Sequence, residues 1–207
     1  KIAKSYFEQS IKDDPSPGAL ANYSGMFIES GESAKCIELC ESAIKADPSL
    51  ATAHWNLAIS LLGEGQWARA WDEHEWGLKT HGVREDRAVL DVPVWDGKSP
   101  GTVLIYGEQG MGDEIMFASM LPDVLKTNPV IFECHHRLET LFKKSFPEVI
   151  FYGTREAKSV SWAHDHKIDY RISVGSLGQF YRRSADAFPG TPYLKAQALP
   201  KDGKFRV

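Results

Sequence analysis

A pattern of glycine and apolar residues recurs with a period of 34 residues in the first third of the chain. Gly31 and Gly65 occupy the same place in two helix–loop–helix patterns. A stripe at the i, i+3, i+4, i+7 spacing of a helix face precedes each glycine. The stripe residues are Leu20, Tyr23, Ser24 and Phe27 in the first unit, and His54, Leu57, Ala58 and Leu61 in the second. Each helix pair leaves apolar surface that a neighbour must cover, so the pattern predicts a stack of helices.

A second stripe follows each glycine and predicts the second helix of each pair. Its members are Cys36, Cys40, Ala43 and Ile44, and then Ala70, His74, Gly77 and Leu78. Asp47 and Pro48 are expected to end the first of these helices. Cys36 and Cys40 share a helix face at a spacing that can hold a metal, but no second ligand pair is near and both fall on core positions, which favours packing. A partial unit from Ala3 to Pro15 predicts that the chain begins inside a repeat.

Composition excludes several classes of protein. With 43% hydrophobic and 25% charged residues the chain is predicted to fold, and no apolar run approaches the ~20 residues that span a bilayer. The net charge is −4 and no run of lysine and arginine is present, so the sequence predicts no positively charged surface for nucleic acid. Three cysteines make no disulfide framework, so we expect a cytoplasmic protein.

The pattern of apolar residues changes from residue 102 onward, from helical stripes to short continuous runs. Short apolar runs at 102–106, 130–134, 149–152 and 169–173 predict four strands, and helical patterns such as the one over 137–146 separate them. Strands that alternate with helices predict a parallel sheet, whose ligands gather at the carboxyl ends of the strands. Tryptophans at 67, 71 and 76 predict an aromatic face that docks onto this sheet domain, so that the interface is fixed.

A glycine-rich loop follows the first predicted strand and opens a helix. Gly107, Gln109, Gly110, Met111 and Gly112 are predicted to bind substrate there, because glycines let the backbone approach a ligand closely. The loop fits neither G-x-G-x-x-G nor a P-loop, which disfavours a nucleotide-dependent oxidoreductase or an ATPase. Asp113 stands where an aspartate caps a helix, so a structural role competes with a chemical one.

Other polar residues follow the later strands. His135, within Cys134-His135-His136, and Ser176 are further candidate substrate contacts, while a glycine turn around Ser176 is also what strand-to-helix geometry needs. His164-Asp165-His166 lies in a polar interval. Neither histidine group has a recognisable partner set, so no metal site is predicted.

The repeats resemble tetratricopeptide repeats. The strings GEQGMGDEIMF, MLP, PVWDG, SLGQF and FPGTPYL resemble bacterial tetratricopeptide proteins whose C-terminal part is similar to the heptosyltransferase-type glycosyltransferases. The resemblance spans the chain and implies a solenoid followed by one of two Rossmann-like domains. In that family the aspartate of a Gly-x-Gly-Asp turn is the proposed general base, a position that Asp113 matches. Relatives with an asparagine ladder grip a polypeptide, which implies peptide contacts at Asn22 and Asn56, with Trp55 beside them; the alternative is that asparagine is simply common there.

The resulting prediction is an α+β multidomain chain: repeats at 1–82, a connector at 83–101, a Rossmann-like acceptor-side domain at 102–200, and the start of a second domain at 201–207. The implied function is inverting sugar transfer from a nucleotide-sugar, with no cofactor, and a sugar acceptor and a peptide or protein as partners. Because the donor half is expected in a missing domain, these residues alone are predicted to be inactive. The alternative is a non-catalytic scaffold for protein–protein interaction.

Overall fold

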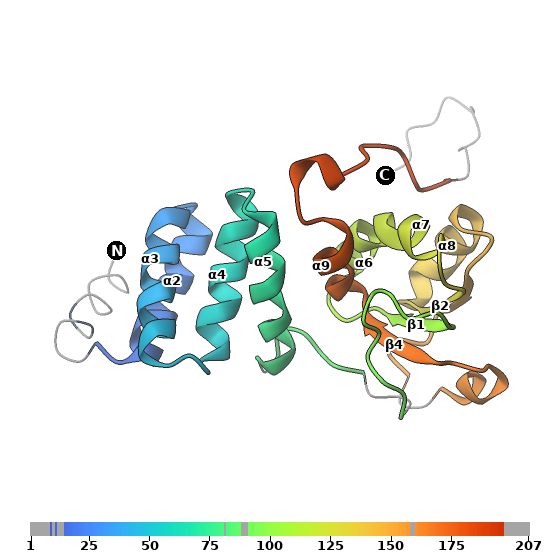
Figure 1. The fold of residues 1–207 in the computed structure, drawn as a ribbon, viewed down its shortest axis with the longest axis horizontal. Coiled ribbons are helices and arrows are strands. Elements are labelled where there is room, and N and C mark those ends of the chain that lie inside the picture. The colour runs from blue at the N-terminus through green and yellow to red at the C-terminus, as the bar shows by residue number, and fades with distance from the viewer. Residues whose placement is uncertain are drawn as a thin grey trace, which may run out of the picture.

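A computed structural model describes residues 9, 11, 15–80, 82–87, 91–157 and 160–196. Within these ranges the chain forms a group of helices followed by a four-stranded parallel sheet with its own helices (Figure 1). This α+β arrangement confirms the coarse fold class. The predicted second-domain start at 201–207, and most of the partial unit that begins at Ala3, lie outside the described residues.

The longer helices that the structure describes in the N-terminal part of the chain stand side by side (Figure 1). They are α2 (Pro17–Ser30), α3 (Ser33–Ala46), α4 (Ala51–Gly63) and α5 (Trp67–His74). Helix α2 begins at a Ser16 cap with Pro17 in its first turn. Helix α3 ends immediately before Asp47, as the sequence predicts.

The two repeat glycines make the same turn. Gly31 ends α2 with φ +74° and Gly65 follows α4 with φ +70°, a left-handed conformation that glycine adopts without strain. In both turns the amide after the glycine donates to the carbonyl five residues earlier, at 2.9 Å. The repeat in the sequence is therefore a repeat in backbone geometry.

The two predicted stripes form the inside of the helical unit. Of their members, Leu20, Ile44 and Leu78 are half-buried and the others are buried. Cys36 and Cys40 are fully buried, with their sulfur atoms 3.9 Å apart. They pack as small apolar side chains, as the core interpretation predicted.

The sheet has the order β3-β2-β1-β4, and every neighbouring pair is parallel. Its strands are β1 (Val103–Tyr106), β2 (Val130–Glu133), β3 (Ile150–Tyr152) and β4 (Tyr170–Ser173). Each lies within one residue of the predicted run. Pro93 and Trp95 extend the β4 edge, since each exchanges one backbone hydrogen bond with Arg171.

Short helices join and cover the strands. The α-helices are α6 (Met111–Phe117), α7 (Leu121–Val124), α8 (Glu139–Ser145) and α9 (Gly178–Tyr181). The 3-10 turns are η1 (Glu75–Lys79), η2 (Ala118–Met120), η3 (His136–Leu138), η4 (Ser161–Asp165), η5 (Val174–Leu177) and η6 (Ala185–Ala187). A second apolar core lies between these helices and the strands, with Phe132, Phe142 and Phe151 at its centre.

Helix α5 docks onto the sheet domain through its tryptophans. Trp71 is 5% exposed, belongs to the core of the sheet domain, and donates from Nε1 to the carbonyl of Arg182 at 2.7 Å. Trp67 packs against Phe188. The predicted fixed interface is therefore present, and it lies between α5 and α9 (Figure 1).

Candidate functional site

The carboxyl ends of the four strands form one edge of the sheet. From β1 the chain moves outward through β2 to β3 and then returns to the other side of β1 with β4. The order therefore reverses between β1 and β4, which is where open parallel sheets bind ligands. The predicted glycine loop follows β1 at this point.

Residues 83–87 of the predicted connector cross this edge of the sheet. Arg84 reaches the groups that follow β1 and β4, Asp86 accepts from Tyr106 of β1 at 2.9 Å and pairs with Arg171 of β4, and Arg87 pairs with Glu133 of β2. These contacts make the segment part of the candidate site.

Arg84 joins the helical unit to the sheet domain. Its buried guanidinium forms a bidentate pair with Glu108, at 2.8 and 2.9 Å, and the side chains of both residues are fully buried. It also donates to Ser173 and Ser176 at 2.8 Å, and to Glu75 at 3.0 Å. Although burial lowers it, the pKa of Arg84 lies above its ordinary value because of the carboxylates of Glu108 and Glu75. The place where the strand order reverses, between β1 and β4, thus holds a buried ion-pair network centred on Arg84.

His74 completes the network as a neutral acceptor. Its Nδ1 lies 2.9 Å from Arg84 Nη1, and its ring packs between Trp71 and Trp55. Burial, together with the charge of Arg84, lowers the pKa of His74 to about 3. The neutral imidazole accepts from the guanidinium, whereas a protonated ring would repel it.

A polar cavity of about 400 Å³ opens beside this network. Its lining residues are Glu85, Asp86, Arg87, Gly107, Glu108, Gln109, Arg155 and Glu156. Two of the predicted substrate contacts, Gly107 and Gln109, line it, whereas Gly110, Met111 and Gly112 do not. The charged and amide side chains of the lining supply both hydrogen-bond donors and acceptors, which suits a ligand rich in hydroxyl groups. A larger cavity, of about 840 Å³ between α7, α8 and residues 188–195, is lined by none of the predicted site residues.

Glu114 of α6 holds the loops around this cavity in place. Its fully buried carboxylate pairs with Arg155 at 2.8 Å and accepts from the amide of His135 at 2.9 Å. A Cβ at Gly107 would lie 2.4 Å from its Oε1, so any larger residue at this position would displace the Glu114 carboxylate. Burial raises the pKa of Glu114 to about 6, against the opposing effects of the His135 amide and Arg155.

Replacing Glu114 with glutamine should change how stability depends on pH. Because the pKa in the folded state is raised from 4.5 to about 6, protonation stabilises the fold, and this stabilisation is lost as pH rises from 4.5 through 6. Glu114→Gln removes that loss, so between pH 4.5 and 7 the variant should gain about 2 kcal/mol relative to the wild type. Urea unfolding at several pH values measures this, and the exposed Glu148→Gln is the control. Parallel curves for wild type and Glu114→Gln would contradict it.

Asp113 is the third residue of α6 and closes its N-terminus. Its Oδ2 accepts from the amide of Gly110 at 2.9 Å, in a capping arrangement. The side chain is partly exposed next to the glycine loop, but it is not among the residues that line the cavity. Asp113 therefore stands three residues after the N-cap, which is Gly110, and not at the cap position that the sequence predicted, although it still closes the helix. Its chemical role stays a prediction.

The predicted peptide contacts lie in different surroundings. Asn22 is exposed on α2, whereas Asn56 is 9% exposed and donates both side-chain hydrogens to α2, to the carbonyl of Ala21 and the hydroxyl of Ser24, at 3.0 Å each. Trp55 packs against His74 and Gly77. Asn56 therefore ties α4 to α2, which differs from the free amide that a peptide ladder needs.

Ser176 and His135 are both buried at the edge of the sheet. The Ser176 hydroxyl accepts from Arg84 and donates to Glu75 at 2.9 Å, so it is used within the network and differs from the predicted substrate contact. His135 is 7% exposed and caps η3, because its Nδ1 accepts from the amide of Arg137 at 3.2 Å. Sequence reasoning missed Arg84, Asp86 and Arg87, whose only signal is a charged run that is typical of a solvated loop.

Comparisons with known proteins give one related chain to report. No family model matches this sequence. Protein FlbA of Caulobacter vibrioides is 28% identical over 202 residues, which cover 89% of this chain and 34% of FlbA. The chain thus spans about a third of the length of the curated relative it matches.

Within the described part of the chain, no helix combines the length and the apolar character that a membrane crossing needs.

Proposed function

We propose that these residues form the helical and acceptor-side part of an inverting glycosyltransferase that uses a nucleotide-sugar, with tetratricopeptide-like repeats leading into a Rossmann-like domain. The observation that carries the proposal is the glycine loop at the point where the strand order reverses, beside a polar cavity that Gly107 and Gln109 line. A cytoplasmic location is proposed with it, and the three free, buried cysteines support that location.

In the proposed reaction a carboxylate removes the proton from the acceptor hydroxyl as its oxygen attacks the anomeric carbon. The nucleoside diphosphate leaves from the opposite face, so the configuration inverts. Asp113 is the proposed base, since its carboxylate lies at the start of α6, next to the loop. Its bond to the Gly110 amide uses one oxygen, Oδ2, and fixes the carboxylate in place.

The test is turnover of the complete polypeptide that contains these residues, measured as nucleoside diphosphate released from UDP-, GDP-, ADP- and dTDP-sugars in the presence of cellular protein as acceptor. Asp113→Asn should lower turnover at least about 100-fold, because a general base contributes 10²- to 10⁴-fold. The amide oxygen of asparagine still accepts from Gly110, so the cap is kept. Asp165→Asn, at an exposed position, is the matched control.

The second candidate is a scaffold without catalysis, and the capping bond of Asp113 favours it. On that account the residue only closes a helix. Nucleoside diphosphate release that is absent from the wild type would support the scaffold. Release that is undiminished in Asp113→Asn would instead overturn Asp113 as the base.

A further inference from the structure

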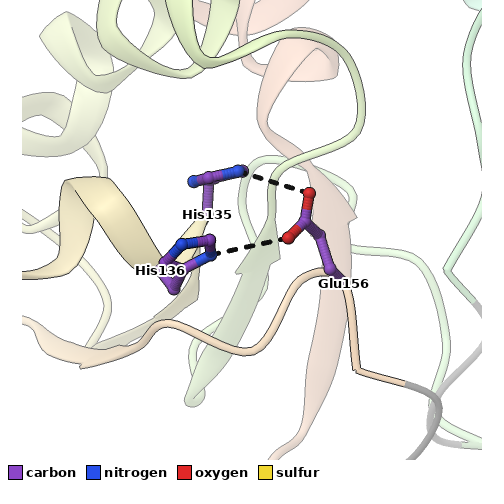
Figure 2. A group of neighbouring side chains, drawn as sticks. All are labelled: His135, His136 and Glu156. Carbon is purple, nitrogen blue, oxygen red and sulfur yellow. Dashed lines mark ion pairs between the residues drawn. The ribbon is translucent and has the colours of Figure 1, made fainter.

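Three side chains with metal-ligating atoms meet where β2 and β3 end. His135 and His136 follow β2, and Glu156 follows β3 (Figure 2). Because neighbouring parallel strands end at the same edge, residues about twenty apart in sequence are brought together. Glu156 Oε1 lies 3.3 Å from His135 Nε2, and its Oε2 lies 3.5 Å from His136 Nδ1. One ligand atom from each residue falls within 4.8 Å of the others.

We propose that His135, His136 and Glu156 bind a zinc ion. Two imidazoles and a carboxylate are one of the three-ligand sets that hold zinc while leaving a fourth position open. Zinc–ligand bonds of about 2.0–2.1 Å in a tetrahedron place ligand atoms roughly 3.3 Å apart. The two histidine–carboxylate separations, one to each oxygen of Glu156, are close to that spacing. All three ligand atoms lie within 4.8 Å of one another, so binding requires them to move closer by at most about 1.5 Å.

The surroundings allow a cation here. Arg155 is the neighbour of Glu156, but its guanidinium is turned to Glu114 and to the carbonyl of Gln109. Glu156 is exposed and has no other ion pair among the described contacts than those with the two histidines. Its carboxylate is therefore available to a metal, and the local positive charge is already neutralised.

Binding through His135 Nε2 places the ring proton on Nδ1. The 3.2 Å bond from the Arg137 amide to Nδ1 is then lost, while His136 coordinates through Nδ1 without losing a bond described for its ring. One hydrogen bond between neutral groups contributes modestly to stability. The proposal is independent of sugar transfer, although Glu156 also lines the polar cavity and so places the ion at its rim.

The test is titration of the purified, metal-free chain with Zn²⁺ by calorimetry, and with Co²⁺ to record the visible absorption of a tetrahedral complex. We expect one zinc per chain. His136→Gln and Glu156→Gln, both at exposed positions, should each weaken zinc binding at least about 100-fold and abolish the Co²⁺ spectrum. His164→Gln and Glu148→Gln are matched exposed controls and should bind as the wild type does.

Two results would overturn the zinc site. One is a wild type that does not bind zinc. The other is equal zinc affinity in the wild type, His136→Gln and Glu156→Gln, which would place any bound ion elsewhere on the chain.

Discussion

Replacing Arg84 with methionine is expected to lower the free energy of unfolding by about 3–5 kcal/mol. The substitution leaves the carboxylate of Glu108 buried without its cation, and the neighbouring hydroxyls of Ser173 and Ser176 lose a donor. Breaking one side of a buried pair is costly because the remaining charge has no water to replace its partner. Urea unfolding followed by tryptophan fluorescence measures the loss.

Arg69 provides the matched control for Arg84. It pairs with Glu41 at 2.7 Å, but both side chains are about half exposed, so Arg69→Met should cost no more than about 1 kcal/mol. The double variant Arg84→Met/Glu108→Gln should recover part of the loss, since it removes the stranded charge as well. Equal losses for Arg84→Met and Arg69→Met would refute the idea that Arg84 holds the two halves together.

Acidification is expected to destabilise the fold through His74. The pKa in the folded state is about 3, against an ordinary value of 6.5, so the folded chain keeps this ring neutral where the unfolded chain protonates it. The stabilisation is fully present above pH 6.5 and is lost as pH falls from 6.5 towards 3. The expected loss is about 1.4 kcal/mol for each pH unit, or about 2–3 kcal/mol by pH 4.5.

His74→Gln isolates this effect, because glutamine still offers an acceptor to Arg84 but does not titrate. The difference in unfolding free energy between wild type and variant should shrink or reverse from pH 7 to 4.5, while Glu114 contributes equally to both proteins. His164→Gln, at an exposed position, should follow the wild type. A constant difference between wild type and His74→Gln across this range would show that the ring is protonated in the fold.

Local patterns predicted most of the fold. The strands match because buried runs of β-branched and aromatic residues are read from neighbours in sequence, and Gly31 and Gly65 mark turns that only a few local bonds define. Trp71 was found in the same way, from its spacing with Trp67. These features depend on short stretches of chain, so the sequence carries them directly.

The candidate site was harder to predict because its contacts join residues far apart in the chain. Arg84 meets Ser173 and Ser176 about ninety positions later, and no periodicity marks such a pair. Asn56 shows a different difficulty. It lies on the first helix of its repeat, as predicted, but its amide hydrogens are donated to α2 and so are not free for a peptide. Whether a polar side chain serves a ligand or its own fold depends on packing that local spacing does not encode.

Amide hydrogen exchange of the complete polypeptide tests the central claim, that the edge after β1 binds the reacting sugars. The comparison is with and without the nucleotide-sugar mixture and acceptor protein of the turnover assay. Binding there should slow exchange at residues 107–109 and 155–156, which line the cavity. Unchanged exchange at these residues, with slowing confined to α2–α4, would contradict sugar binding at this edge and would identify the helices as the binding surface.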